Sequence, residues 1–473
     1  MNVLAIDQGT SGTKAIVVSQ DRGVIATADA PVRPQYGSGG LVEQDPGELL
    51  ESVLDAGRRA LAAAGEPVAA VGLANQGETV LAWDPQSGQP LTPAIVWQDR
   101  RSADVCNRLR DHADRLAEIT GLSLDPYFAA PKMTWLREQL TREGVVTTTD
   151  AWLVHRLTGA FVTDASTASR TMLLDLDRVE WSDEAVAIFG LTGERLPQVV
   201  GCAEPVGETT SFGATPLPLT GLAVDQQAAL FAQGCLESGA AKCTYGTGAF
   251  LLANVGTTPL RSTTGLAASV AWLLGGTASY CFDGQVYTVG SAVRWLADLG
   301  VISGPEEIDG LGATVPDAGG VTLVPALAGL AAPSWRPDAR ASLTGLGLDA
   351  TRAHIVHALV DGIALLVAEL VTAVATDLGG PLAMLRVDGG LTASRLLMQT
   401  QADVLQIPVE VFATPDATAL GVAAFARLGL DPAAVPAAVV GGAQPAVVYE
   451  PQISADEATA RIERFRSVLA ATT

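Results

Sequence analysis

Residues 4–18 read LAIDQGTSGTKAIVV. Two apolar runs flank a loop of glycine, threonine and serine, with Asp7 before the loop and Lys14 at its end. The pattern predicts two strands joined by a polar turn whose backbone N–H groups and hydroxyls form an anion-binding concavity. The loop is not a Walker-type P-loop, because GxxxxGK(S/T) fails at the glycine before Lys14 and a strand follows instead of a helix. Taken alone, the stretch fits an unliganded polar turn equally well.

The surrounding residues predict an α/β unit. A helix is expected over 45–65, with Asp45 as its N-cap, Pro46 at the first helical position and Gly65 at its end. Short apolar runs between polar turns predict the strands. The strands are expected at 2–6, 14–19, 23–29, 69–75, 80–84 and 94–97, with a further helix near 101–118.

A second, similar cycle begins near residue 242 with a strand, a Gly-Thr turn and another strand. Two such halves predict a bilobal protein with a cleft between an N-terminal domain, 1–232, and a C-terminal domain, 233–473. The Ala-, Pro- and Gly-rich stretch 431–448 is expected to be a surface connection. The other expected elements are strands at 242–246, 249–255 and 383–387 and helices at 290–299, 351–376, 392–405 and 454–470.

Composition limits the class of protein. The chain has 473 residues, 48% of them hydrophobic and 17% charged, which excludes a disordered or fibrous protein. A net charge of −22 repels nucleic acid and anionic membranes. The chain enters an apolar strand at once, without a secretion signal, so we expect a cytoplasmic protein. The apolar stretch 357–375 contains two acidic residues and is expected to be a core helix, and the five cysteines are expected to be buried thiols.

Two further loops in the second half are rich in glycine. YGTGAF, residues 245–250, repeats the Gly-Thr turn between strands, so the two turns are expected to face each other across the cleft and hold a polyphosphate. LRVDGGLTAS, residues 385–394, places two glycines after a strand, where a nucleotide can approach the backbone. Glycine at a strand-to-helix turn is also common without a ligand.

These motifs carry a family resemblance. The segments AIDQGTSGTKA, NQGETVLAWD, PAIVWQDRR, DPYF, VDQQAALFAQG, YGTGAF, LAGLAAPSW and VDGG occur in this order from residue 3 to about residue 425. The chain resembles the FGGY carbohydrate kinases, and among them the glycerol kinases, of the actin and hexokinase ATPase superfamily. The resemblance implies two ribonuclease-H-like domains with ATP and substrate meeting in the cleft between them.

The resemblance also implies roles for single residues. Asp225, which the residues alone suggest is a helix N-cap, matches the catalytic base that accepts the proton of the attacking hydroxyl. Asp7 matches the Mg²⁺ position, as a carboxylate beside a phosphate loop suits that ion. Many family members have arginine where Lys14 stands, and glycerol kinases often have asparagine where Ser394 stands. The implied phosphate and nucleotide contacts are Thr10, Ser11, Lys14, Thr247, Gly290, Gly390 and Ser394.

The acceptor pocket is implied in the same way. Glu78, Asp225 and Gln226 match positions that hydrogen-bond polyol hydroxyls, and the matching pocket walls are Trp97, Tyr127 and Phe250. Without the resemblance, these positions are better interpreted as core or turn residues. Glu78 favours the glycerol kinases over the xylulose kinases, in which this segment usually reads Gln-Met-His-Gly.

Gly77 departs from the family pattern. Glycerol kinases have an arginine there whose guanidinium bonds substrate hydroxyls, and losing such a bond costs roughly 1.5–3 kcal/mol. We therefore expect weak use of glycerol and, because the side chain is absent, a longer polyol or a small ketose as acceptor. The segment 211–221 has no basic residue, so no inhibition by fructose 1,6-bisphosphate is expected.

Two alternatives accompany this interpretation. One is a pentulose kinase of the same family, and the other is a non-catalytic sugar or nucleotide sensor with the actin-like fold. A degenerate kinase would be expected to have lost Asp7 or Asp225, and both are present. Family members are commonly dimers or tetramers, so a homodimer or homotetramer is the expected assembly.

Overall fold

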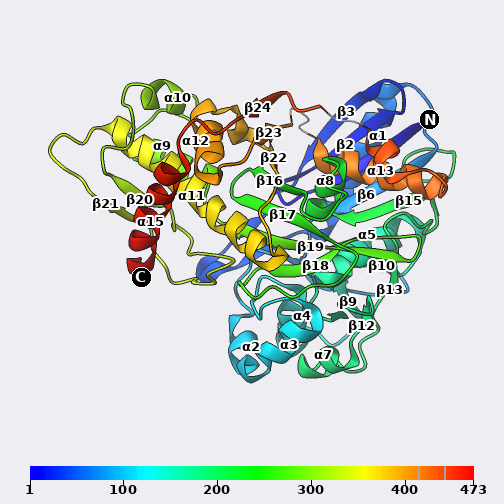
Figure 1. Cartoon of the computed structure of the whole chain (residues 1–473). Coiled ribbons are helices and arrows are strands. Elements are labelled where there is room, and N and C mark those ends of the chain that lie inside the picture. The colour runs from blue at the N-terminus through cyan, green and yellow to red at the C-terminus, as the bar shows by residue number, and fades with distance from the viewer. Residues whose placement is uncertain (413–415, 442–443, 473) are drawn as a thin grey trace.

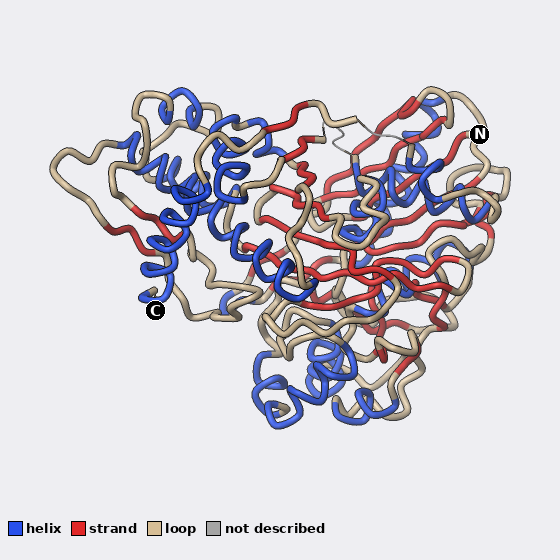
Figure 2. The backbone as a smooth tube through the Cα atoms, in the orientation of Figure 1, coloured by secondary structure: helices blue, strands red, loops and turns tan. Residues whose placement is uncertain are grey.

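Two large sheets with the same internal arrangement organise the chain (Figures 1 and 2). The structure is a computed structural model that describes residues 1–412, 416–441 and 444–472. The first sheet has the strand order β14-β15-β6-β1-β2-β3, and the second has the order β18-β19-β17-β16-β22-β23-β24. In each, an antiparallel hairpin comes first and a later strand pairs in parallel with its first strand, β6 with β1 and β22 with β16. The predicted fold of two α/β halves is therefore confirmed.

The strands of the first sheet are β1 (Asn2–Gln8), β2 (Gly12–Ser19), β3 (Gly23–Pro31), β6 (Ala70–Asn75), β14 (Glu208–Thr209) and β15 (Leu217–Val224). The second sheet contains β16 (Ala241–Tyr245), β17 (Ala249–Gly256), β18 (Ala267–Leu274), β19 (Thr277–Val286), β22 (Leu385–Asp388), β23 (Val409–Val411) and β24 (Val447–Tyr449). A third sheet contains β4 (Gln35–Tyr36), β5 (Val42–Gln44), β7 (Val80–Trp83), β8 (Ala94–Ile95) and β9 (Val145–Thr148). The short pairs are β10 (Val162–Asp164) with β13 (Gln198–Val200), β11 (Leu174–Asp175) with β12 (Glu180–Trp181), and β20 (Thr322–Val324) with β21 (Ser342–Thr344).

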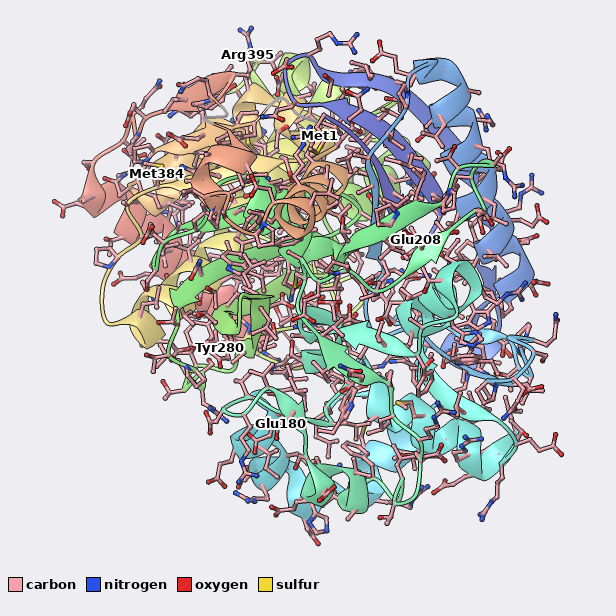
Figure 3. All side chains as sticks on the ribbon, turned by 90° about the vertical axis from the view of Figure 1, so that its right-hand side faces the viewer. Met1, Glu180, Glu208, Tyr280, Met384 and Arg395 are labelled. Carbon is pink, nitrogen blue, oxygen red and sulfur yellow. The ribbon has the colours of Figure 1, made fainter. Side chains whose placement is uncertain are left out.

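The helices lie around these sheets, with α9–α12 and α15 at the left of Figure 1 and α2–α4 and α7 below. Figure 3 turns the molecule by 90° and labels Glu208 on the edge strand β14 and Glu180 in the lower part. The helices of the first half are α1 (Pro46–Ala64), α2 (Ala103–Arg108), α3 (Ala113–Thr120), α4 (Ala129–Gln139), α5 (Thr149–Thr158), α6 (Ala165–Ser169), α7 (Asp183–Ile188) and α8 (Asp225–Ala232). The others are α9 (Gly290–Asp298), α10 (Glu307–Gly312), α11 (Arg352–Leu378), α12 (Arg395–Leu405), α13 (Ala417–Leu430), α14 (Pro436–Val440) and α15 (Ala455–Ala471).

Local signals placed most elements correctly. In α1, the Asp45 carboxylate accepts hydrogen bonds from the N–H groups of Gly47 and Glu48, and Gly65 ends the helix in the left-handed conformation. Most of the apolar face of α11 is buried against neighbouring elements, as expected of a core helix. All five cysteines are buried, as predicted.

Three expectations about elements were wrong in detail. The helix expected near 101–118 is broken into α2 and α3 by a 3₁₀ turn over 110–112, whose residues are charged and have no buried side chain to hold a continuous helix. The helix expected from 392 begins at Arg395, because Ser394 is extended and serves as its N-cap. The stretch 431–448 contains α14 and the start of β24 as well as connecting chain, and its residues 442–443 lie outside the described residues.

Helix α13 belongs to the second half of the sequence but packs against the first sheet. It contacts β1, β6 and β15 and lies along α8 (Figure 1). The approach is close: a Cβ added at Gly72 would lie 2.6 Å from the Val422 carbonyl oxygen, and one added at Gly421 would overlap the Ala228 carbonyl oxygen. Buried side chains from both halves, including Phe231 and Phe425, share one apolar cluster there. The two halves therefore share a common core.

Candidate active site

Three parallel strands of the first sheet bring the candidate residues to one edge. Strands β1, β6 and β15 run in the same direction, with Gln8 opposite Asn75 and Asn75 opposite Val224. Asp7 lies at the end of β1, Gly77 and Glu78 follow β6, and Asp225 follows β15. The sheet register thus gathers residues that are far apart in the sequence.

Asp7 lies in a strongly acidic environment at this edge. Burial and the nearby Asp225 carboxylate raise its pKa from 3.8 to about 7, and Asp416 adds to the effect while Lys14 opposes it. A divalent cation would relieve this repulsion, and carboxylate oxygen is a ligand that Mg²⁺ prefers. Among the described residues, no group of three or more His, Cys, Asp or Glu side chains could hold a metal. Mg²⁺ is usually bound in proteins through one or two carboxylates together with substrate phosphates and water, and Asp7 could supply such a carboxylate.

The loop after β1 is ordered by its own backbone and by its neighbours. The Gly9 N–H donates to the Gly12 carbonyl at 3.0 Å, and the Thr10 hydroxyl accepts a hydrogen bond of 2.9 Å from Trp97 Nε1. Ser11 is exposed. Lys14 Nζ lies 2.9 Å from an oxygen of Asp416, just before α13. The predicted phosphate loop is therefore tied to the acceptor side through Trp97 and to the second half of the chain through Lys14.

The second Gly-Thr turn joins β16 to β17. Thr247 is exposed at its tip, and its carbonyl accepts hydrogen bonds from the N–H groups of Val289 and Ser291 at the start of α9. Gly290 packs against this turn, where an added Cβ would lie 2.6 Å from the Gly246 carbonyl oxygen. Gly290 thus serves the close contact between α9 and the turn.

The segment after β22 combines an open position with engaged ones. Gly389 has φ +97° and packs against the Tyr245 backbone. A Cβ added at Gly390, in contrast, would have no heavy atom of the described residues within 4 Å beyond its chain neighbours. Ser394 is nearly buried, and its hydroxyl donates to Asp309 at 2.6 Å and caps α12. Of the predicted nucleotide contacts in this segment, Gly390 is open to a ligand, while the Ser394 hydroxyl is engaged within the protein.

Asp225 is the first residue of α8 and not its N-cap. Its carboxylate accepts a 2.7 Å hydrogen bond from the Gln226 N–H, and no side-chain bond caps this helix. Burial raises its pKa, while Lys242 and Arg170 act in the opposite direction. The fully buried Lys242 donates to Gln226 Oε1 at 2.6 Å. Lys242 therefore both fixes Gln226 and supplies positive charge beside the candidate base.

Aromatic side chains form a wall beside Asp225. The rings of Trp97 and Tyr127 meet edge to face with centroids 5.7 Å apart, and Trp97 meets Phe250 in the same way at 6.3 Å. The structure thus brings together the three predicted wall residues, which come from the segment after β8, the segment before α4, and β17. Their edge-to-face packing holds a fixed apolar surface.

A buried guanidinium links both halves at this wall. Arg170 Nε lies 2.6 Å from Glu78 Oε1, and Arg170 Nη2 lies 2.7 Å from Asp283 Oδ2. The guanidinium also lies over the Tyr127 ring, 5.7 Å from its centroid. Glu78 has φ +57°, a conformation that is costly outside glycine and is found at functional sites. Two carboxylates and one guanidinium leave this buried cluster with one net negative charge when ionised.

Gly77 is buried, and a Cβ at this position would meet little of the described structure. Among the described residues beyond its chain neighbours, the one heavy atom within 4 Å of an added Cβ is Val224 Cγ2, at 3.0 Å. A Cβ at this position would therefore need a small shift of Val224.

Comparison with known proteins identifies the family. A model of the N-terminal domain of the FGGY family of carbohydrate kinases matches residues 2–232, and a model of the C-terminal domain of that family matches residues 241–430. The chain belongs to the FGGY family of carbohydrate kinases. It is accordingly an ATP-dependent kinase of a small polyol or sugar.

Relatives of this FGGY kinase include several glycerol kinases. It is 44% identical over 447 residues to a glycerol kinase of Myxococcus xanthus, with 90% of each chain covered, and 41% identical to one of Bordetella parapertussis, with 99% of this chain and 96% of that one covered. A crystal structure of Plasmodium falciparum glycerol kinase with ADP superposes with a TM-score of 0.94 at 29% identity, covering 100% of this chain and 98% of that one. A xylulose kinase from Rhodospirillum rubrum superposes with a TM-score of 0.89 at 25% identity, covering 100% and 99%.

Sequence reasoning missed three charged residues of this FGGY kinase site: Arg170, Lys242 and Asp416. Arg170 is the one charged residue between Ala165 and Leu174, and such an isolated charge must find a partner when buried. Lys242 likewise interrupts an apolar strand. Asp416 carries no such signal, because its role depends on where α13 docks.

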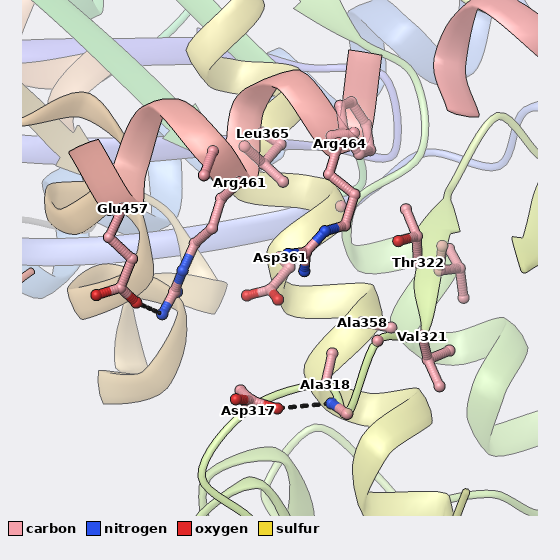
Figure 4. Close-up of a pocket in the computed structure, with 16 residues that line it drawn as sticks. Asp317, Ala318, Val321, Thr322, Ala358, Asp361, Leu365, Glu457, Arg461 and Arg464 are labelled. Atoms are coloured by element: carbon pink, nitrogen blue, oxygen red, sulfur yellow. Dashed lines mark hydrogen bonds and ion pairs between the residues drawn. The ribbon is translucent and has the colours of Figure 1, made fainter. Parts of the chain in front are cut away.

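A cavity of about 280 Å³ lies elsewhere in the FGGY kinase, between α11, α15 and the segment before β20 (Figure 4). Asp361 and Arg464 extend into it, and Arg461 pairs with Glu457 at 2.7 Å. Acidic and basic side chains of the protein both line this cavity, and none of the predicted site residues does.

Proposed function

We propose that Asp225 is the general base of a glycerol-kinase-type reaction, in which a hydroxyl of a small polyol attacks the γ-phosphate of ATP. The observation that carries this proposal is the position of Asp225 between two groups of residues. Asp225 follows β15, which pairs with β6 leading to Glu78 on the acceptor side, and its carboxylate lies near enough to raise the pKa of Asp7 on the phosphate side. Phosphoryl transfer depends mainly on positioning and charge stabilisation, with a base to take the hydroxyl proton.

On the donor side, the loop after β1 and Thr247 from the second half face the phosphates. Lys14 supplies a positive charge once the phosphates compete with Asp416 for it. Asp7 would hold Mg²⁺, directly or through water, and the ion when bound neutralises charge on the phosphates. Gly390 leaves room for the nucleotide beside β22.

On the acceptor side, Glu78, Asp225 and Gln226 bond hydroxyls, and Trp97, Tyr127 and Phe250 cover the carbon chain. The glycerol kinases among the relatives support a polyol as acceptor. The glycine at position 77 supports weak use of glycerol itself and an acceptor with a longer chain. Closure of the two halves would exclude water, which otherwise competes as acceptor.

A coupled assay of ADP release over glycerol, tetritols, pentitols and ketoses tests this function. Asp225→Asn is expected to lower acceptor-dependent kcat by at least about a hundredfold, since a positioned base contributes roughly 10²–10⁴-fold. Asp111→Asn, an exposed change outside the site, is the control and should leave kcat unchanged.

Equal turnover by wild type and Asp225→Asn would remove Asp225 from the role of base. A wild-type protein that binds ATP and polyol but never releases ADP would support the sensor alternative. A higher kcat/KM for glycerol than for every longer acceptor would contradict the proposed acceptor class.

A further inference from the structure

Three buried polar atoms at the acceptor wall have no hydrogen-bond partner among the described residues. They are Arg170 Nη1, Asp283 Oδ1 and Gln285 Oε1. The three residues are 3%, 7% and 3% exposed, respectively. Buried donors and acceptors are nearly always satisfied in folded proteins, by the protein itself, by water or by a ligand.

The strand register places these residues on one wall. In the antiparallel pair β17 and β19, Gln285 lies opposite Phe250 and Asp283 opposite Leu252. Directly opposite residues share a face of the sheet, and so do residues two apart on one strand. Gln285 and Asp283 are therefore on the face that carries Phe250, next to Trp97.

Arg170 extends this wall to Glu78. Its Nη2 bonds Asp283 and its Nε bonds Glu78, which leaves Nη1 as the free donor of a guanidinium already fixed on two sides. Asp283 and Gln285 thus share the face of Phe250, and Arg170 connects this face to the predicted polyol contact Glu78.

The chemistry of these atoms selects a hydroxyl. A hydroxyl group donates and accepts at once, so it can accept from Arg170 Nη1 while donating to Asp283 or Gln285. A carboxylate on the acceptor could accept from Arg170 Nη1, but it has no proton to donate to Asp283 Oδ1 or Gln285 Oε1. The wall therefore fits a neutral polyol or ketose.

We propose that Arg170, Asp283 and Gln285 form a polar subsite that binds the hydroxyls of an acceptor beyond its third carbon. The subsite lies in the acceptor pocket, and so this inference rests on the proposed function. It makes Gln285 a specificity-determining residue for acceptors of four to six carbons.

Gln285→Ala is the sharpest test, because it removes one acceptor atom without uncovering a buried charge. We expect its kcat/KM to fall at least about tenfold for tetritols, pentitols or ketopentoses and less than about twofold for glycerol, since sites that bond a hydroxyl discriminate by that bond. Gln285→Glu, which keeps an oxygen at this point, should retain part of the preference. Thr277→Ala, at the exposed end of the same strand, is the control.

The same variants are compared by calorimetric binding of a pentitol without ATP. Weaker pentitol binding by Gln285→Ala than by the wild type supports the subsite, whether or not the protein phosphorylates an acceptor. Failure of the proposed function is detected by a different measurement, as the absence of ADP release. An unchanged long-to-short acceptor ratio overturns the proposal. That result would mean that Gln285 Oε1 is satisfied by a water and not by the acceptor.

Discussion

Asp7 makes the stability of the folded protein fall as pH rises. Its pKa rises from 3.8 to about 7 because of burial and of the Asp225 carboxylate. The folded state therefore holds this proton more tightly than the unfolded state. The resulting cost to stability grows as pH rises from about 4 and is complete above about 7.

Asp7→Asn should consequently stabilise the protein, in EDTA and without nucleotide, more at pH 8 than at pH 5.5. The expected difference in unfolding free energy is on the order of 2 kcal/mol, measured by urea denaturation at both pH values. Kinase activity should be lost in the same variant. A stabilisation that is equal at both pH values would contradict the assigned environment of Asp7.

Individual residues also show which parts of the candidate site could be predicted from the sequence. Asp7, Glu78 and Asp225 were assigned because each lies in a short motif that resembles the FGGY pattern, and Asp7 also stands beside a Gly-Thr loop. Arg170 and Lys242 were not, because their partners lie 92 and 16 residues away and only the folded sheets bring them together. Ser394 was assigned to the nucleotide, whereas its hydroxyl bonds Asp309 on a separate helix.

At the level of elements, the docking of α13 depends on glycine. An added Cβ at Gly421 would overlap the Ala228 carbonyl oxygen in α8, whose backbone cannot withdraw without moving Asp225. Gly421→Ala is expected to lower stability by about 1–3 kcal/mol or more, as overpacking does, and to reduce kcat. Thermal unfolding and steady-state rates measure the two effects.

Gly310→Ala in α10 is the matched control, because it has open space around an added Cβ and should be neutral or stabilising by up to about 1 kcal/mol. A Gly421→Ala variant as stable as this control would mean that α13 lies farther from α8 than the structure places it.

The elements themselves were predictable where their signals are local. The hairpins at both Gly-Thr turns and the capped helix α1 needed only neighbouring residues. The break between α2 and α3 was not predictable from caps, since it reflects the lack of buried side chains over 110–112. The order of strands in each sheet was not predicted, because it depends on pairing between strands that are distant in the sequence.

At the scale of the whole molecule, an ion pair joins residues 402 positions apart. Lys14 and Asp416 lie 2.9 Å from each other, and this bond raises the pKa of Lys14. Phosphates must compete with Asp416 for the ammonium group. Asp416→Asn is therefore expected to lower the KM for ATP by up to about fivefold. This factor corresponds to about 1 kcal/mol, the upper end of the free energy that an exposed ion pair contributes. Initial rates over a range of ATP concentrations test this, and an increased KM would show that Asp416 itself assists nucleotide binding.

The position of α13 also has a consequence for how the chain is made. The first sheet is complete once β15 has been synthesised, yet its face under α13 stays uncovered for about two hundred residues more. During synthesis on the ribosome, the apolar face of the first sheet therefore remains exposed to water until α13 has been synthesised. We expect nascent chains stopped between the two halves to be targets of chaperones and proteases, and the active-site cleft to be among the last parts of the molecule to form.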